Sequence, residues 1–343
     1  MYYLENTVIK LIQKKRESGE FTMLTPENSL KMIIDFLTNL QNDNYITFNP
    51  NGFNQKGEVI FLEAPTGSGK DNLFIQLSKQ NPEKHYIELN MDMFRKHYKL
   101  FISNNESLND IDFAKLTNQF SYEIFLLIQE ILLNYYPGTN IIISGTLRET
   151  DWIEDLMKIY KSNQMTKYTL KLITLTISKK EGLYSVIKRY VNIVDEKRKS
   201  SSFISGTARY TSSEYYSETF DNFATNFGYF VNIFENTPGE LIDSIEIYRR
   251  NKSLIDFNDD NLIYSSNREK DKNKNPISTL RTLRDQAYQI PLDDVIDTLN
   301  KVKENLIYLK EQNTLIDILY TLSSLLNYNV DDINKAKRKI SDF

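Results

Sequence analysis

The sequence predicts an α/β fold, in which helices cover a mainly parallel central sheet and further helical segments precede and follow it. Two observations support this prediction. Short apolar runs alternate with helical segments in the middle of the chain, which is typical of βαβ units with parallel strands. Apolar residues at helical spacing also occur at both ends of the chain. The expected strands are Val59–Leu62, Tyr86–Leu89, Ile141–Ile143 and Leu170–Ile177.

Residues 1–55 are expected to form a helical N-terminal region. Apolar residues recur at helical spacing within Ser29–Leu40 and, more briefly, within Met1–Lys15. Asn49–Gly52 combines Asn, Pro and Gly, which is typical of a turn. We therefore expect helices first and a turn just before the sheet begins.

Residues 56–257 are expected to form the sheet-containing domain. A helix over Asn72–Ser78 should follow the first strand, and a long apolar helix over Phe113–Asn134 should separate the second strand from the third. Beyond Lys179 the chain becomes helical again, interrupted by the polar, Ser-rich loop Arg198–Gly206. Ser244–Tyr248 is a candidate for the last strand.

The remainder, residues 258–343, is expected to be a linker followed by a helical C-terminal region. Asn258–Pro276 is rich in Asn, Asp and Lys, which favours a mobile connection. Helical periodicity returns from Pro291 onward, and Leu315–Leu326 is apolar enough to be a packed helix. Two roles stay open for this region, an interaction surface or extra helices packed on the core.

The composition excludes several kinds of site. The absence of cysteine excludes disulfides and thiolate metal sites, and two histidines, His85 and His97, are too few for a histidine-rich one. A formal net charge of −4 argues against capture of nucleic acid over a broad surface. We find no apolar stretch that could cross a membrane and no export signal, so the cytoplasm is the expected location.

The most informative motif is the segment Ala64–Lys70, which follows the first expected strand. It resembles the phosphate-binding loop pattern G-x-x-x-x-G-K-[ST]. Glycines let backbone N–H groups approach phosphate oxygens, and the following helix directs its positive end at the same place. A glycine-rich turn that happens to contain lysine is the alternative. We expect ATP phosphates to bind at Pro65, Thr66, Gly67, Ser68, Gly69, Lys70 and Asp71.

Two positions of this loop depart from the pattern. Ala64 replaces the first glycine, a small change. Asp71 replaces the Ser or Thr whose hydroxyl normally binds Mg²⁺. Because hard cations favour carboxylate oxygens, Asp71 is a candidate metal ligand, although its charge would also lie beside the triphosphate.

A carboxylate follows the second expected strand. Asp92 lies at the carboxyl end of that strand, which is the ligand-binding edge of a parallel sheet, so it is placed to accept a proton from an attacking hydroxyl. The alternative is that Asp92 caps a helix starting near Met93. Arg95 and His97 either position substrate or lie on the exposed face of that helix.

Further polar residues follow the third strand and flank the Ser-rich loop. Thr146 and Arg148 offer hydrogen-bond donors at the same sheet edge, although an ordinary strand-to-helix turn capped by Thr150 or Asp151 would also explain this segment. Arg189 and Arg209 lie on either side of the loop. Guanidinium groups stabilise the charge that develops in phosphoryl transfer, but each arginine taken alone is more typical of a surface residue.

Together, these segments resemble the zeta-toxin family of P-loop kinases from about Glu58 to Phe257. The family pattern Asp-x-Phe-Arg with a nearby His matches Asp92–Arg95 and His97, with the His one residue sooner than usual. The Glu-Gly-Thr-x-Arg-Thr pattern matches Ser144–Thr150 with one inserted residue. The other matches, in the family's order, are Arg189-Tyr190, Arg209–Glu214 and Ile245–Arg250.

The resemblance implies a three-layer P-loop kinase fold and an enzyme that uses ATP and Mg²⁺. It implies that the acceptor is a hydroxyl of UDP-N-acetylglucosamine or a related nucleotide sugar, that the protein is a bacterial toxin, and that a small helical antitoxin protein neutralises it. By position, Lys70 would bind phosphate, Asp92 would be the general base, and Arg189 and Arg209 would clamp the transferred group. Thr146 and Arg148 would face the sugar nucleotide.

Three departures from the family pattern keep other functions open. Ser144 stands where the family usually has Glu, Asp71 replaces the metal-binding hydroxyl, and Tyr216-Ser217 replaces a common His-Asp pair. One alternative is a kinase for another acceptor, such as a dinucleotide or a nucleic-acid end. A second is a nucleotide-binding interaction module without transfer activity.

Overall fold

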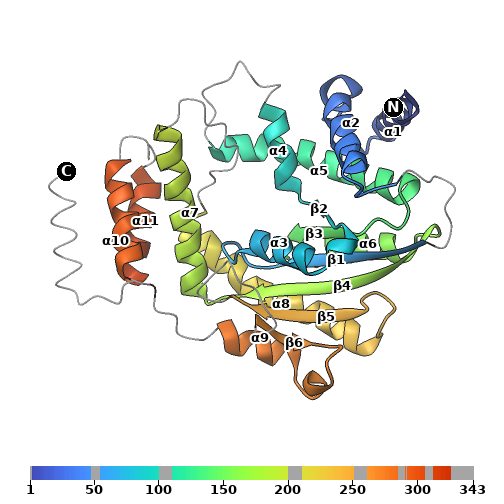
Figure 1. The fold of residues 1–343 in the computed structure, drawn as a ribbon. Coiled ribbons are helices and arrows are strands. Elements are labelled where there is room, and N and C mark those ends of the chain that lie inside the picture. The colour runs from blue at the N-terminus through green and yellow to red at the C-terminus, as the bar shows by residue number, and fades with distance from the viewer. Residues whose placement is uncertain are drawn as a thin grey trace.

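A parallel sheet edged by one antiparallel strand runs through the centre of the computed structural model (Figure 1). The structure describes residues 2–47, 55–99, 110–199, 211–250, 261–284, 290, 292–305 and 312–325. In the described residues the sheet has six strands in the order β2-β3-β1-β4-β5-β6, which confirms the predicted α/β fold. The strands are β1 (Gln55–Glu63), β2 (Ile87–Leu89), β3 (Ile141–Gly145), β4 (Thr166–Thr176), β5 (Ser244–Arg249) and β6 (Leu262–Ser265).

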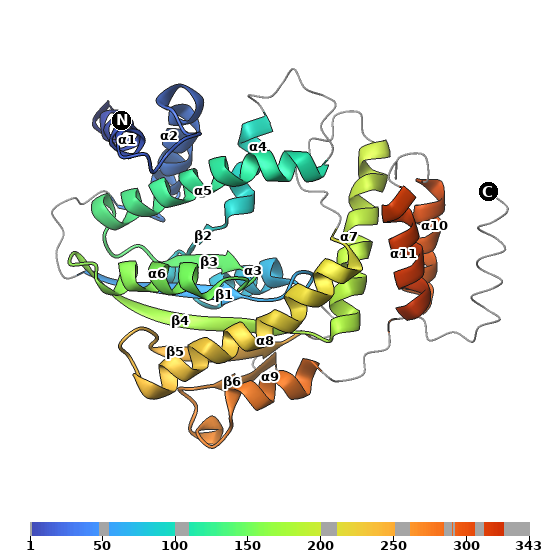
Figure 2. The same cartoon turned by 180° about the vertical axis from the view of Figure 1, so that it is seen from behind.

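Helices cover both faces of this sheet, and further helices precede and follow it in the chain (Figure 2). The helices are α1 (Tyr2–Glu17), α2 (Pro26–Asn42), α3 (Lys70–Gln80), α4 (Met91–Lys99), α5 (Asp110–Tyr135), α6 (Thr150–Lys161), α7 (Lys179–Lys199), α8 (Ser213–Asn236), α9 (Pro276–Arg284), α10 (Leu292–Glu304) and α11 (Gln312–Leu325), with short 3₁₀ turns at Pro82–Lys84 and Glu269–Asp271. None of these described helices is long and apolar enough to cross a membrane.

The alternation of side chains in β1 explains the layers. Val59 and Phe61 point into a core shared with α1, α2, α5, α6 and α8, whereas Ile60 and Leu62 pack against α3 on the other face. All four side chains are at most 2% exposed, as expected for a strand buried on both faces. β1 lies between β3 and β4, where the order of strands reverses, and ligands of open parallel sheets bind at this place.

The predicted connection over Asn258–Pro276 is wrong for its described part. Residues 262–265 form β6, an antiparallel edge strand on β5, and the chain then turns through a short 3₁₀ segment. Asp271 explains the turn, because its buried carboxylate accepts a hydrogen bond from the Ser265 N–H and pairs with Lys274. The polar residues of this segment form its turns, and they obscured in the sequence the short apolar run that forms β6.

The N-terminal helices pack directly on α5. Leu4, Val8 and Ile12 of α1 belong to the same hydrophobic core as the sheet. The buried Glu123 of α5 accepts hydrogen bonds from three consecutive backbone N–H groups, those of residues 22, 23 and 24, between α1 and α2. Because buried N–H groups need partners, this carboxylate fixes the α1–α2 connection to the core.

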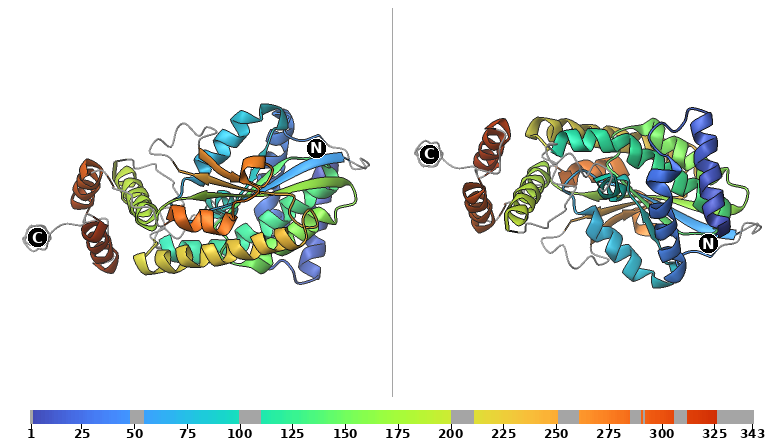
Figure 3. Two further views of the ribbon diagram at one scale, coloured as in Figure 1. Left: turned by 90° about the horizontal axis from the view of Figure 1, so that it is seen from below. Right: turned by 90° about the horizontal axis from the view of Figure 1, so that it is seen from above.

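The C-terminal helices α10 and α11 pack on the outer side of α7 (Figure 3). Ile187, Val191 and Val194 of α7 share an apolar cluster with residues of both helices. Buried polar bonds join the same elements, including one from the Asn305 side-chain amide to Asp195. Asp317 of α11 accepts two hydrogen bonds from Ser213, one from its N–H and one from its hydroxyl, at the start of α8. The described part of this region therefore braces both α7 and α8.

Candidate active site

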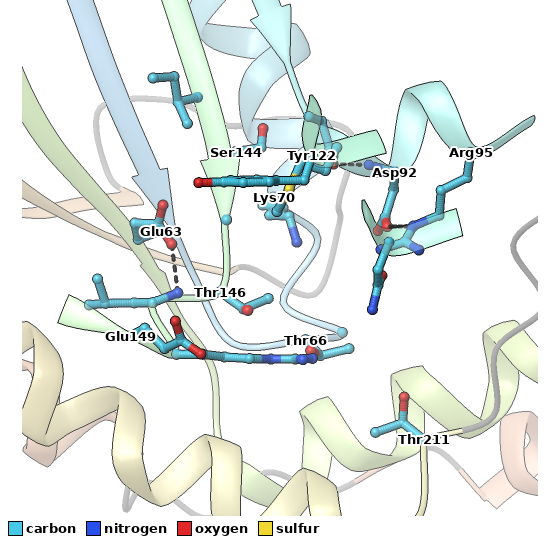
Figure 4. Close-up of a pocket in the computed structure, with 18 of the residues that line it drawn as sticks. Glu63, Thr66, Lys70, Asp92, Arg95, Tyr122, Ser144, Thr146, Glu149 and Thr211 are labelled. Carbon is cyan, nitrogen blue, oxygen red and sulfur yellow. Dashed lines mark hydrogen bonds and ion pairs between the residues drawn. The ribbon is translucent and has the colours of Figure 1, made fainter. Parts of the chain in front are cut away.

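A cavity of about 1010 Å³ opens at the carboxyl edge of the sheet (Figure 4). The phosphate-binding loop, α4, α5, the β3–α6 connection, α7 and the start of α8 contribute to its wall. Eight of the predicted site residues line it, namely Thr66, Gly67, Lys70, Asp92, Arg95, Thr146, Arg148 and Arg189. The structure thus brings together residues that are widely separated in the sequence.

Other predicted site residues do not line this cavity. Pro65, Ser68, Gly69 and Asp71 belong to the loop but lie outside the cavity lining. The side chain of His97 and all of Arg209 lie outside the described residues, so their predicted roles stay predictions.

The loop has the backbone shape that phosphate binding needs. Gly67 and Gly69 have φ angles of 77° and 91°, in the left-handed region that favours glycine. The helix α3 begins at Lys70, so its first N–H groups and its positive end face the loop. The Ser68 hydroxyl is buried and has no hydrogen-bond partner among the described residues. These features fit a bound nucleotide phosphate, with Lys70 as the cation.

An arginine fastens the loop to α7. The Arg250 guanidinium, which follows β5, donates hydrogen bonds to the Gly67 carbonyl at 2.9 Å and to the Ser185 hydroxyl at 3.0 Å. It also pairs with Glu181 of α7. Since Arg250 and Glu181 are both mostly buried, this contact holds the phosphate-binding loop and α7 in one fixed arrangement.

Two glycines allow the loop, α7 and α8 to approach closely. A Cβ on Gly67 would lie 2.5 Å from the Gly182 carbonyl of α7. A Cβ on Gly182 would in turn lie 1.9 Å from the Tyr216 hydroxyl of α8. The Tyr216 side chain, which stands where the family often has His, is therefore packed against α7 and is only 1% exposed.

Asp71 has the chemistry to bind a metal ion. It lies in the first turn of α3, close enough to Glu88 of β2 that its charge adds to the burial that raises the pKa of Glu88. The Ser144 hydroxyl donates a hydrogen bond to Glu88 at 2.9 Å. No group of three acidic or histidine ligands occurs among the described residues. Mg²⁺ uses one or two carboxylates together with phosphates and water, so these residues fit it.

Asp92 lies in the first turn of α4, and its alternative role as a helix cap is wrong. The helix begins at Met91, and Asn90 caps it by accepting the Asp92 N–H at 2.9 Å. The Asp92 carboxylate is 52% exposed toward the cavity and accepts a hydrogen bond from Arg95 Nε at 2.5 Å. Arg95 is itself buried and also donates to Thr117 of α5. In the described contacts Arg95 therefore orients Asp92.

The β3–α6 connection places Thr146 and Arg148 in the lining of the same cavity. Its shape does not come from a capped turn, because Glu149 precedes α6 and makes no side-chain cap bond. Instead, the Asn226 amide of α8 donates to the carbonyls of Leu147 and Arg148. The Arg148 guanidinium lies 5.1 Å from the centre of the Tyr215 ring. The connection is thus held by α8, although Arg148 itself is exposed.

Glu63, at the end of β1, is a site residue that the sequence analysis missed. Its side chain is 0% exposed, lines the cavity, and accepts a hydrogen bond from the Leu147 N–H at 2.6 Å. Burial raises the pKa of Glu63 to about 8, although the Leu147 N–H and the Lys70 ammonium act in the opposite direction. The carboxyl is therefore mostly protonated at neutral pH. Its signal in the sequence was a carboxylate that directly follows the apolar run Val59–Leu62.

Aromatic residues of the cavity wall were also missed. Tyr122 and Phe125 of α5 and Trp152 of α6 line the cavity, and the rings of Phe125 and Trp152 are 5.8 Å apart. These positions belong to the apolar periodicity of their helices, which predicts core packing. Only the folded arrangement shows that they border a cavity.

We predict that Gly182→Ala destabilises the protein. The added methyl group meets the Tyr216 hydroxyl, so α7 or Tyr216 must shift, at a cost of about 1–3 kcal/mol. Gly228→Ala is the matched control in α8, because its methyl group makes an ordinary contact at 3.5 Å with Ile277. We expect the control to keep or raise stability. Equal free energies of unfolding in urea for the two variants would contradict the close contact.

A second prediction concerns pH. The folded-state pKa of Glu63 lies above its ordinary value of 4.5, so the folded protein retains a proton that the unfolded chain releases. Through this residue the free energy of unfolding falls as pH rises from about 4.5 to about 8, by up to about 1.4 kcal/mol per unit, and levels off above. Glu63→Gln removes this contribution. Urea unfolding across this range measures it, and parallel pH curves for both proteins would refute it.

Comparison with known proteins identifies the family. The family model described as Zeta toxin matches residues 44–267, more than half of the chain. A chain from the PezAT chromosomal toxin–antitoxin system of the human pathogen Streptococcus pneumoniae has a similar fold, with a TM-score of 0.57 and 15% identity. The match covers 82% of the present chain and 98% of that chain.

A weaker similarity is found to a chain of the AvrRxo1-ORF1:AvrRxo1-ORF2 complex, solved with sulphate ions and also with ATP. The TM-score is 0.46 at 12% identity, over 88% of the present chain and 90% of that chain. A comparison with curated protein sequences finds no match. The family model decides the assignment: the chain belongs to the zeta-toxin family, a family of P-loop kinases.

Proposed function

We propose that the protein transfers the γ-phosphoryl group of ATP to a hydroxyl of UDP-N-acetylglucosamine or a related nucleotide sugar, and that it acts as a bacterial toxin. One observation carries the proposal. Lys70 and Asp92 follow different strands of the sheet and line the same cavity, together with Thr146 and Arg148 of the β3–α6 connection. A phosphate-binding lysine and a carboxylate beside one cavity are the two groups that a kinase of this type needs.

In the proposed reaction, the γ-phosphate lies at the loop, where backbone N–H groups and Lys70 hold it. The acceptor hydroxyl binds beside Asp92, which takes its proton as the oxygen attacks the γ-phosphorus. A new P–O bond forms, the bond to the bridging oxygen of the β-phosphate breaks, and ADP leaves. Arg189 of α7, and by prediction Arg209, neutralise the charge on the transferred group.

Mg²⁺, held by Asp71 with support from Glu88, would neutralise phosphate charge when bound. The contacts of Arg95 orient Asp92 toward the cavity. The contacts of Arg250 keep α7, and so Arg189, in a fixed position relative to the loop. Both arrangements reduce the motion required to reach the transition state.

The main test is Asp92→Asn. Asparagine keeps an oxygen for the Arg95 hydrogen bond but is a poor base, so kcat should fall by about 10²–10⁴-fold while the KM for ATP changes little. Transfer of labelled phosphate from Mg-ATP to UDP-N-acetylglucosamine measures this. Asp155→Asn is the control, because Asp155 is an exposed carboxylate of α6 that does not line the cavity. Near-normal turnover of Asp92→Asn would eliminate the base assignment.

The same assay separates the alternative functions. A panel of acceptors distinguishes a nucleotide sugar from a dinucleotide or a nucleic-acid end, since the labelled product identifies the acceptor. ATP binding without a labelled product from any acceptor would instead indicate an interaction module without transfer chemistry.

We also propose a neutralising partner, a small helical antitoxin, because the protein of the PezAT system belongs to a toxin–antitoxin pair. Expression of this chain alone in bacteria should then slow growth, and the Asp92→Asn variant at equal abundance should not. Equal growth of cells that express either protein would argue against a toxic kinase.

A further inference from the structure

Glu63 makes an unusual contact at the base of the cavity. Its carboxyl lies over Gly145, so closely that a Cβ at that position would come within 2.4 Å of Glu63 Oε1. The pairing of β1 with β3 explains this contact, because Glu63 and Gly145 are partners in the parallel register. Because Gly145 has no side chain, it leaves room for the Glu63 carboxyl. An apolar side chain at position 63 would fill the same space but would form no hydrogen bond.

The carboxyl of Glu63 also determines the backbone of the β3–α6 connection. Oε2 accepts the Leu147 N–H at 2.6 Å, and Leu147 has a φ angle of +49°, which is uncommon for a residue other than glycine. Such a backbone conformation persists only where its surroundings hold it. Glu63 holds it from the sheet, and the Asn226 amide holds the following carbonyls from α8.

The other oxygen of Glu63 is unsatisfied. Oε1 is buried and has no hydrogen-bond partner among the described residues. A neutral carboxyl group has one oxygen that accepts and one O–H that donates, so it matches a single N–H donor with its accepting oxygen. An ionised carboxylate in the same place would lack most of the donors it requires. Among the described residues, the charged group that acts on Glu63 is the Lys70 ammonium of α3.

We propose that Glu63, in its neutral form, is the positioning residue of the acceptor side: it holds the Gly145–Glu149 connection so that Thr146 and Arg148 face the acceptor. The proposal rests on the proposed kinase function for the nature of the acceptor. The proposal has a structural half and a functional half. The structural half, that a proton on Glu63 holds the connection, is independent of any acceptor. Ionisation of Glu63 would place an unpaired buried charge beside Gly145 and loosen the connection.

Hydrogen exchange tests the structural half without an acceptor. Exchange of the peptide that contains Gly145–Glu149 is measured by mass spectrometry in the full chain and corrected for intrinsic rates. The wild-type protein should lose protection there as pH rises from about 4.5 to about 8, by up to about tenfold per unit, with no further loss above, whereas Glu63→Gln should stay protected. Glutamine keeps an accepting oxygen for Leu147 and cannot ionise. Peptides of α10 are the control for global unfolding.

Steady-state kinetics with UDP-N-acetylglucosamine tests the functional half. Glu63→Leu keeps a similar volume but loses the hydrogen bond to Leu147, so the KM for this acceptor should rise by about tenfold or more while the KM for ATP stays within about twofold. Glu63→Gln should restore a wild-type KM and remain active at higher pH than the wild type. Equal changes in both KM values would show a general structural role and overturn the proposal.

The two experiments separate failure of this inference from failure of the proposed function. If wild-type protein transfers no phosphate to the sugar nucleotide but its Gly145–Glu149 peptide shows the proton-dependent protection, the acceptor assignment fails and the role of Glu63 stands. Protection of this peptide that is the same at all pH values, or lost in Glu63→Gln, would overturn the role of Glu63 whatever the acceptor.

Discussion

The close contact between the phosphate-binding loop and α7 is the constraint on which the rest of the site depends. Gly67 can take its left-handed conformation and still touch the Gly182 carbonyl only because Gly67 has no side chain. Arg250 then fastens the same turn by its hydrogen bond to the Gly67 carbonyl. This contact places α7, and therefore Arg189 and Tyr190, beside the loop. The helices α10 and α11 brace the other side of α7, so they support the cavity from outside the family match.

Charge at the carboxyl edge of the sheet is arranged around one lysine. Lys70 lies near both Glu63 and Glu88, and it lowers the pKa of each, whereas burial raises both. Burial has the larger effect in each case, so neither carboxyl is an ordinary surface acid. Because Glu63 is mostly neutral, the positive charge of Lys70 is less compensated than it would be beside an ionised Glu63. Such a lysine is well suited to bind phosphate.

Much of the fold was predictable because its central strands contain apolar runs. The runs at Val59–Leu62 and Ile141–Ile143 form central strands, since burial on both faces demands apolar residues throughout. The strand β6 was missed because a short edge strand within a polar segment has little apolar signal. The packing of the terminal helices on α5 and α7 involves contacts between distant segments, which helical periodicity does not specify.

The glycine loop of the site could be predicted from the sequence, but the residues that surround the loop could be predicted much less well. Lys70 and Asp92 were found because the ends of parallel strands share one edge. The bond of Arg95 to Asp92, the burial of Glu63 and the aromatic side chains of α5 and α6 depend on tertiary packing, which local patterns do not encode. The capping role considered for Asp92 failed for a local reason, because Asn90 two residues earlier takes it.

In the proposed reaction, one cavity joins an ATP phosphate site to a base that activates an acceptor hydroxyl. The most direct measurement is ³¹P NMR of a reaction that contains the full chain, Mg-ATP and UDP-N-acetylglucosamine. We expect ADP to appear together with a new phosphomonoester signal in equal amount, at the expense of the γ-phosphate of ATP. ADP accompanied only by inorganic phosphate, or ATP that stays intact in the presence of the acceptor, would contradict it.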